Sequence, residues 1–262
     1  MSDAPGADGL TGALAALAAD PARRPVLVAL DFDGTLAPLR DDPALSRILE
    51  PGPAVLRDVA ALDGVRLALV SGRAMHDLHT LADVPAGTFL IGSHGAERAR
   101  VTAHGLDRDI VRLTDEQADR LATLGAQAAL VTRGRDGVWV ETKPTAVVVH
   151  TRLAERDVSA QALADAVALG KRIGSGVLQG KDVVELSVLP ASKGAALVAL
   201  RSELGTPVVL YAGDDTTDEH AFEALGPDDL TVKVGPGPTV ATYRLDGPAE
   251  VVDALAGLVT AW

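Results

Sequence analysis

The stretch VLVALDFDGTL, residues 26–36, decides the fold of this chain of 262 residues. Five apolar residues with strand character lead into Asp31 and Asp33, which are followed by Gly34 and Thr35. Side chains two residues apart on an extended chain point the same way, so both carboxylates start on one side of the chain at the carboxyl end of a buried strand. Ligands of open α/β sheets bind at that edge. The sequence therefore predicts a catalytic strand end.

Two carboxylates this close together repel each other. At ~4 Å a pair of like charges costs about 4 kcal/mol at an effective dielectric constant near 20, and such a site normally needs a cation or a shared proton. A phosphate dianion beside the acids would add to the repulsion. Magnesium suits a site of carboxylates and substrate phosphate. We therefore expect Mg²⁺ as the cofactor.

Apolar strands alternate with helical stretches on both sides of a middle segment. Strand patterns at residues 26–30, 65–70 and 88–91 enclose helical patterns at 52–62 and 75–81. A similar unit follows later, with helices expected over 193–204 and 218–224 and strands over 207–211 and 230–234. This alternation predicts an α/β fold with a Rossmann-like parallel sheet covered by helices. We expect this core to comprise residues 1–97 and 187–262.

The middle segment, residues 98–186, has a different rhythm. Helical patterns over 115–128 and 158–173 flank two short strand patterns with a turn at Pro144, and strand character continues to Ser187. These features predict an inserted α+β module. Because the insertion follows a strand at the ligand-binding edge, we expect it to act as a cap that excludes water from the site.

The composition of the chain limits which ligands and partners it can bind. A formal charge of −12 argues against a nucleic-acid footprint or attraction to anionic membranes. The chain lacks cysteine, which excludes disulfides, thiolate catalysis and Cys-based zinc sites. No run of ~18 apolar residues suggests a membrane span, and the N-terminus lacks the basic region of a secretion signal. We expect a soluble cytoplasmic protein, monomeric by preference, that acts on a small molecule.

Three further signals follow apolar strands or begin helices. Ser71-Gly72-Arg73 follows a strand and offers a hydroxyl and backbone N–H groups at a helix start, where anions bind. Lys193 begins another helix and can reach a phosphate. Asp214 and its acidic neighbours follow a third strand. Taken singly, Ser71 could be a helix N-cap, Lys193 a surface lysine, and Asp215, Asp218 and Glu219 acids favoured by a helix dipole.

The ordered set DxDGT, SGR, K and GDD resembles the haloacid dehalogenase-like superfamily of aspartate-nucleophile phosphotransferases, across the entire core. The resemblance implies that Asp31 attacks phosphorus and forms an aspartyl-phosphate, while Asp33 is the general acid and base. It also implies the following further roles: Ser71 and Lys193 hold the phosphoryl oxygens; Asp31, the backbone carbonyl of Asp33 and Asp214 bind Mg²⁺; Asp215 and Asp218 support them.

Longer motifs resemble one family within this superfamily, the trehalose-6-phosphate phosphatases. They are DFDGTLAP (31–38), GSHGAE (92–97), ETKPTAVVVHTR (141–152), QGKDVVELS (179–187), SKG (192–194) and GDDTTDE (213–219). The resemblance implies that cap side chains hydrogen-bond the glucose hydroxyls and that the SGR loop also binds substrate. The positions are Glu141, Lys143, Arg152, Lys181 and Glu185 in the cap, with Gly72 and Arg73 in the core. A surface ion-pair network is the alternative role for the cap set.

Three positions are less well defined by sequence. His94 and Glu97 fall at the expected first crossing from core to cap, where we expect His94 to fix the hinge and Glu97 to support either the hinge or the substrate. Trp139 is expected to pack in the core of the cap. Ser187-Val188 departs from the family pattern, because the basic residue and proline common there are absent and the proline is displaced to Pro190. This departure concerns the return to the core.

These features together predict a magnesium-dependent phosphomonoesterase that hydrolyses trehalose 6-phosphate. Other sugar phosphatases of the superfamily, acting on sucrose phosphate or mannosyl-3-phosphoglycerate, are the nearest alternative. A phosphate-responsive signalling or sensor module is the alternative from another class, since receiver domains also cluster acids, a hydroxyl and a lysine around magnesium. The acid at i+2 from the nucleophile and the cap of roughly ninety residues argue against it.

Overall fold

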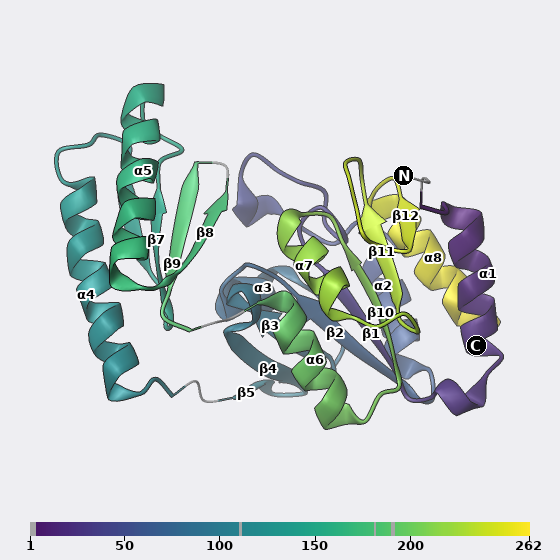
Figure 1. Cartoon of the computed structure of the whole chain (residues 1–262). Helices are drawn as coiled ribbons and strands as arrows, with labels where there is room; N and C mark the ends of the chain where they lie inside the picture. Colours follow the sequence, from purple (N-terminus) through teal and green to yellow (C-terminus); the bar gives the residue numbers. More distant parts are fainter. Residues whose placement is uncertain (1–3, 110–111, 181, 190–191) are drawn as a thin grey trace. The chain divides into compact units, whose positions relative to one another are not determined.

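The computed structural model describes residues 4–109, 112–180, 182–189 and 192–262. The chain forms two compact units (Figure 1). One unit, the core, comprises Met1–Asp109 with Ser192–Trp262, and the other, the inserted unit, comprises Ile110–Ala191. This arrangement confirms the predicted α/β core with an α+β insertion.

The core contains an eight-stranded sheet in the order β12-β11-β10-β1-β2-β3-β4-β5. Its strands are β1 (Val26–Asp31), β2 (Val65–Val70), β3 (Phe89–Gly92), β4 (Glu97–Thr102), β5 (Gly105–Arg108), β10 (Val208–Gly213), β11 (Leu230–Val234) and β12 (Tyr243–Leu245). The first six strands in the sheet order pair in parallel, whereas β4 and β5 pair antiparallel. The parallel strands place their carboxyl ends at one edge.

β1 lies in the middle of this sheet and is buried along its whole length. Its neighbours come from distant parts of the chain, because Val26 pairs with Val65 of β2 and with Val208 of β10. The register places Asp31 beside Val70, the last residue of β2. The two strand ends that carry Asp31 and Ser71 therefore lie next to each other.

Helices cover both faces of the core sheet (Figure 1). One face packs against α1 (Ala7–Ala18), α2 (Gly52–Ala61), α3 (Met75–Leu81) and α8 (Pro248–Ala261), and the other against α6 (Lys193–Leu204) and α7 (Thr216–Ala224). The alternation along β1 separates the two layers: Val26, Val28 and Leu30 join the first hydrophobic cluster, whereas Leu27 and Ala29 join the second. Asp31, two residues after Ala29, continues on the side of α6.

The division between the units differs from the sequence-based one. The core extends to Asp109 and resumes at Ser192 rather than ending at residue 97 and resuming at 187. The reason is the β4–β5 hairpin, since Leu90 of β3 pairs with Ala99 of β4 and adds the hairpin to the sheet. The hairpin lies at a sheet edge, and its charged residues alternate with small ones. The sequence therefore lacks the apolar run that predicts a core strand, and its pattern places the hairpin in the insertion.

The inserted unit is a four-stranded antiparallel sheet packed against two helices. Its strands follow the order β6-β7-β9-β8 and are β6 (Trp139–Thr142), β7 (Ala146–His150), β8 (Gly176–Gly180) and β9 (Val183–Ser187), with helices α4 (Asp115–Thr132) and α5 (Arg156–Ile173). Thr114 and Gln117 form a capping box at the start of α4. Val147, Val149, Val184 and Leu186 pack with both helices, so the alternate positions form a second face. This second face, the polar face, carries Glu141, His150 and Glu185 beside Val148 and Leu178.

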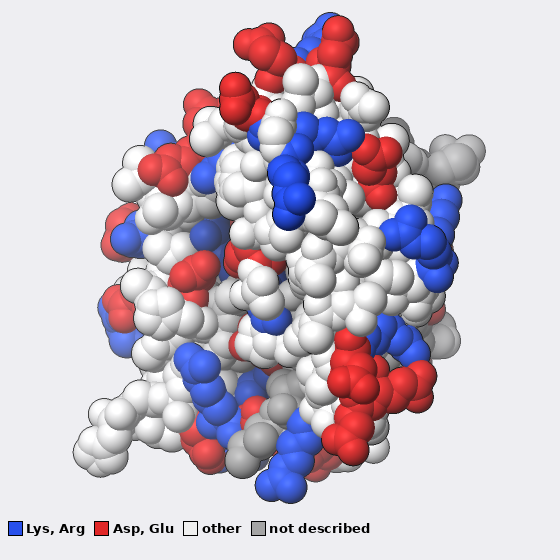
Figure 2. All heavy atoms as spheres, turned by 90° about the vertical axis from the view of Figure 1, so that its left-hand side faces the viewer, with Lys and Arg blue, Asp and Glu red and all other residues white. Residues whose placement is uncertain are grey.

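Charge is distributed unequally between the units. Residues 110–191 carry ten basic and ten acidic side chains, so the formal charge of −12 lies in the remaining sequence. On the side where α4 and α5 lie, side chains of both signs are interspersed (Figure 2). Within the described residues, no helix is both long and apolar enough to span a membrane.

Candidate active site

The carboxyl end of β1 holds a buried ion pair. Asp31 ends this strand, and its Oδ1 lies 3.0 Å from Nζ of Lys193, the first residue of α6. Ser192 caps the same helix by accepting a hydrogen bond from the N–H of Ala195. Both members of the pair are almost fully buried, at 4% and 2% exposure. Lys193 is therefore part of the site and not a surface lysine.

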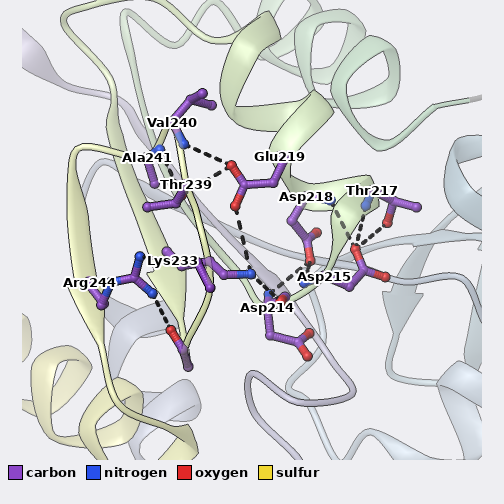
Figure 3. Close-up of polar contacts among 12 residues, drawn as sticks. Asp214, Asp215, Thr217, Asp218, Glu219, Lys233, Thr239, Val240, Ala241 and Arg244 are labelled. Atoms are coloured by element: carbon purple, nitrogen blue, oxygen red, sulfur yellow. Dashed lines mark hydrogen bonds and ion pairs between the residues drawn. The ribbon is translucent and has the colours of Figure 1, made fainter. Parts of the chain in front are cut away.

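Asp218 links this ion pair to the end of β10. Its Oδ1 accepts hydrogen bonds from Nζ of Lys193 at 2.8 Å and from the hydroxyl of Tyr211 at 2.5 Å. Its Oδ2 accepts from the backbone N–H groups of Asp214 and Asp215 (Figure 3). Both carboxylate oxygens of Asp218 thus accept two hydrogen bonds each from groups of the protein. Asp218 therefore fixes the loop after β10 and orients Lys193.

Asp214 approaches the loop that follows β1. A Cβ atom at Gly34 would lie 2.1 Å from Oδ2 of Asp214, so the close approach requires glycine at that position. Gly34 also has a φ of 80°, a conformation that glycine adopts at low cost. One carboxylate oxygen each of Asp31, Asp214 and Asp218 lies within 4.8 Å of the others. The fold thus brings together carboxylates from positions far apart in the sequence.

Proton affinities reflect the crowding of these acids. Burial raises the pKa of Asp31 well above its ordinary value, although Lys193 opposes the shift. Burial and the neighbouring Asp218 raise the pKa of Asp214 to about 6. Burial would also raise the pKa of Asp215, but Lys193 and hydrogen bonds from Thr217 and Asp218 lower it to about 2. The Asp31–Asp214 pair is therefore the part of the cluster that most needs a proton or a cation.

The donor set fits a hard divalent cation. Carboxylate oxygens are the ligands that such ions prefer, and Gly34 leaves the space that Asp214 needs beside Asp31. Asp218 lies within reach of the same position, but its oxygens already accept four hydrogen bonds. Asp31 and Asp214 are accordingly the side chains best placed to bind the ion, with Asp218 behind them.

Asp33 is held by the loop after β2. Nε and one terminal nitrogen of Arg73 each lie 2.6 Å from a different carboxylate oxygen of Asp33. The guanidinium also donates to the hydroxyl of Ser46 and lies 5.4 Å from the ring centroid of Phe32. Ser71 is buried beside it, and its hydroxyl oxygen accepts from the N–H of Arg73. Arg73, expected to bind substrate, thus contacts the second aspartate of the motif.

Sequence analysis missed two residues behind this cluster, Tyr211 and Lys233. Lys233, at the end of β11, is buried and donates a hydrogen bond to the backbone carbonyl of Asp214 (Figure 3). Its Nζ also lies 3.7 Å from Oε1 of Glu219. Tyr211 and Lys233 lie within strands whose apolar neighbours mask them, so their roles become visible once the strands are placed side by side.

The polar face of the inserted sheet collects most of the predicted cap residues. Oε2 of Glu141 lies 2.8 Å from Nε2 of His150, and Lys143 pairs with Glu185 at 2.6 Å. Lys143 and Glu185 are about nine-tenths buried, unlike a solvated surface pair. Lys181 lies outside the described residues. The face offers both hydrogen-bond donors and acceptors.

Trp139 lies on this polar face instead of in the apolar core of the unit. Its ring stacks on His150, with centroids 4.8 Å apart and planes 11° apart. The guanidinium of Arg152 lies 5.2 Å from the centroid of the same ring. His150 was not among the predicted site residues. It follows a run of valines in β7, and its position directly opposite Trp139 is set by the strand register.

The remaining predicted positions have structural contacts. Asp215 is the N-cap of α7, where it forms a capping box with Asp218. Glu97 and His94 lie within the core rather than at the division between the units. Ser187 accepts a hydrogen bond from the N–H of Leu189, whereas the displaced Pro190 lies outside the described residues.

Comparisons with known sequences agree on one family. A family model described as trehalose-phosphatase matches residues 29–249. A trehalose-phosphate phosphatase of Mycobacterium marinum is 35% identical over 241 residues, which is 86% of this chain and 59% of that protein. A trehalose-6-phosphate phosphatase of Escherichia coli is 34% identical over 243 residues, covering 88% of this chain and 85% of that protein. The chain thus spans about three fifths of the mycobacterial relative.

Solved structures share the fold. A trehalose-6-phosphate phosphatase related protein matches with a TM-score of 0.71 at 26% identity, covering 89% of this chain and 97% of that one. The C-terminal domain of the Candida albicans trehalose-6-phosphate phosphatase matches with a TM-score of 0.74 at 21% identity, covering 99% of both chains. These matches include both units of the chain.

Proposed function

The chain belongs to the trehalose-phosphatase family, and from that premise we propose that it hydrolyses trehalose 6-phosphate to trehalose and phosphate. The observation that carries the proposal is the cluster at the carboxyl ends of β1 and β10, where Asp31 contacts Lys193 and lies beside Asp214. A buried carboxylate next to a fixed ammonium and a candidate cation site suits attack on an anionic phosphate.

In the first step, a carboxylate oxygen of Asp31 attacks phosphorus and the bond from phosphorus to the sugar oxygen breaks. Asp33 donates a proton to that departing oxygen, which leaves as a hydroxyl group of trehalose. Lys193 and the hydroxyl of Ser71 bind phosphoryl oxygens. Arg73, which holds Asp33 with two hydrogen bonds, keeps this acid in a fixed orientation.

In the second step, Asp33 accepts a proton from a water molecule, whose oxygen attacks the phosphorus of the aspartyl-phosphate. The bond between phosphorus and the Asp31 oxygen breaks, which releases inorganic phosphate and restores the carboxylate. One residue thus serves as acid and then as base.

We propose Mg²⁺ as the cation, bound by Asp31, Asp214 and the backbone carbonyl of Asp33. When bound, it would neutralise the crowded acids and the phosphate charge. Asp218 and Lys233 have supporting roles, since they fix the loop and the carbonyl group of Asp214. Asp215 supports the start of α7.

We also propose that the inserted unit selects the sugar. Glu141, Lys143, Arg152 and Glu185 lie on or next to its polar sheet face, and Lys181 joins this set by resemblance. Carboxylates accept hydrogen bonds from sugar hydroxyls and cations donate them, so a face with both binds a polyol. A site built this way rejects sugars that leave its buried polar groups unpaired.

Phosphate release across four substrates tests the proposal. Trehalose 6-phosphate, sucrose 6-phosphate, glucose 6-phosphate and mannosyl-3-phosphoglycerate would be compared with Mg²⁺ and with a chelator. A chelator-sensitive preference for trehalose 6-phosphate is expected. A preference for another sugar phosphate would overturn the assignment of the inserted unit, and absence of turnover on all four would overturn the enzymatic proposal.

A further inference from the structure

Residues 92–97, Gly-Ser-His-Gly-Ala-Glu, connect β3 to β4 in the core and adopt an unusual backbone conformation. Ser93 has a φ of 48° and His94 a φ of 54°. Left-handed conformations at two consecutive residues other than glycine are uncommon, and they persist where the surrounding contacts impose them. The contacts around this segment therefore hold its backbone in place.

The segment is bonded to the loop that carries Ser71, Gly72 and Arg73. The N–H of Ser93 donates to the carbonyl of Arg73 at 2.7 Å, and the N–H of His94 donates to the carbonyl of Ser71 at 3.0 Å. A Cβ atom at Gly72 would lie 2.4 Å from the imidazole ring of His94. The backbone on both sides of Gly72 is thus fixed by the two residues with left-handed conformations.

Glu97 links these contacts together. Its Oε2 accepts a hydrogen bond from the hydroxyl of Ser93 at 2.6 Å and from the N–H of Met75 at 3.0 Å. Met75 is the first residue of α3, which follows the Ser71–Arg73 loop. One carboxylate oxygen therefore joins the residue that binds the carbonyl of Arg73 to the helix that comes after it.

Gly95, within the same segment, lies against the N-terminus of α6. A Cβ atom at Gly95, whose φ is 109°, would lie 2.6 Å from the carbonyl oxygen of Ser192. Ser192 directly precedes Lys193, the ammonium donor to Asp31. Residues 92–97 thus contact the backbone beside both residues proposed to bind phosphoryl oxygens, Ser71 and Lys193.

We propose that Glu97 is a positioning residue that fixes the Ser71–Arg73 loop, and through the Arg73 guanidinium the orientation of Asp33; this inference rests on the proposed function. The path consists of three direct contacts: Glu97 to Ser93, Ser93 to the carbonyl of Arg73, and the guanidinium of Arg73 to Asp33 at 2.6 Å. A shift of the loop backbone displaces the guanidinium, and the carboxylate then loses its two hydrogen bonds.

The substitution Glu97→Ala removes the acceptor, whereas Glu97→Gln retains a carbonyl oxygen that can accept both bonds. A sugar phosphate needs a proton on its leaving oxygen, but p-nitrophenol leaves readily as an anion. Glu97→Ala should therefore lower kcat about 100-fold on trehalose 6-phosphate, and clearly less on p-nitrophenyl phosphate. Glu97→Gln should restore most of the loss.

Asp229→Ala supplies a control, since Asp229, like Glu97, accepts hydrogen bonds from backbone N–H groups, here those of Val209 and Gly226. Asp229 is buried and also pairs with Arg201 at 2.8 Å, so its loss should destabilise the fold. It lies before β11, at the opposite edge of the sheet from the site. This variant should unfold at a lower temperature with no change in the ratio of the two activities. Equal losses on both substrates for Glu97→Ala, with no change in the binding of a phosphate-like oxyanion, are expected of a merely destabilised protein and would overturn the proposal.

A binding measurement separates this inference from the proposed function. Tungstate, an oxyanion that mimics phosphate, would be titrated calorimetrically into the wild-type protein and the variants. Weaker binding by Glu97→Ala, restored in Glu97→Gln, supports the positioning role even if trehalose 6-phosphate proves not to be the substrate. Unchanged tungstate affinity together with an unchanged activity ratio would refute the positioning role while leaving hydrolysis of trehalose 6-phosphate intact.

Discussion

The substitution Gly34→Ala tests whether the close approach of Asp214 to the β1 loop is essential. The new methyl group would lie 2.1 Å from Oδ2, 2.3 Å from Cγ and 2.7 Å from Oδ1 of Asp214. An ordinary van der Waals contact needs 3.4 Å or more. The carboxylate must therefore retreat by more than about 1 Å, and a misplacement of that size costs about 100-fold in turnover.

Backbone conformation adds a second, separable effect. Gly34 has a φ of 80°, and placing alanine in the left-handed region costs about 1–2 kcal/mol. At about 2–4 °C per kcal/mol for a chain near this size, the melting temperature should fall by several degrees. Gly205→Ala provides the control, since Gly205 has a φ of 61° with no atom within 4 Å of the added Cβ.

The assay combines phosphate release with thermal unfolding in the presence and absence of Mg²⁺. Both variants should melt at lower temperatures than the wild type, but Gly34→Ala alone should lose turnover and the stabilisation that Mg²⁺ confers. The reasoning is refuted if Gly34→Ala retains the turnover of Gly205→Ala and is stabilised by Mg²⁺ to the same extent.

Three further outcomes are expected. Asp31→Asn should abolish phosphate release because the attacking oxygen is lost, while circular dichroism shows an intact fold; appreciable turnover in the pure variant would exclude Asp31 as nucleophile. Glu185→Ala removes a carboxylate of the polar face, the one 2.6 Å from Lys143, and should lower activity on trehalose 6-phosphate far more than on p-nitrophenyl phosphate. Equal losses would show that the inserted unit does not select the sugar. Because burial and Asp218 raise the pKa of Asp214 to about 6, the folded metal-free protein binds a proton that the unfolded chain does not bind until lower pH. Its melting temperature in chelator should therefore rise as the pH falls from 7 to 5, less so in Asp214→Asn, and a fall over this range would contradict the assignment.

Local sequence was sufficient to predict the parallel strands β1, β2, β3, β10 and β11, the helices α2, α3, α6 and α7, and the strand ends that carry the acids. Asp31 and Asp214 each follow a buried apolar run, and the parallel arrangement brings such strand ends to one edge. The same logic located Lys193 at the start of α6, because a polar residue followed by lysine and glycine precedes an apolar helical pattern. These features depend on patterns a few residues long.

Other features depend on contacts that no local pattern contains. From sequence, Tyr211 is one more apolar-type residue of the buried strand β10. Its role follows only from the hydrogen bond that its hydroxyl donates to Asp218. The pairing of Arg73 with Asp33 joins residues forty positions apart and depends on the order of the strands. The β4–β5 hairpin was missed because its alternating charged residues resemble a solvated segment, and edge strands commonly carry such residues.

The central position of β1 also has a consequence for how the protein is made. Its partner β2 follows within the same stretch of chain, but its other partner, β10, begins at Val208, after the whole inserted unit. The inserted unit contains all four strands of its own sheet in one continuous stretch. During synthesis from the N-terminus we therefore expect it to fold first. Until β10 emerges from the ribosome, one edge of β1, the strand that ends in Asp31, stays open to pairing with other chains.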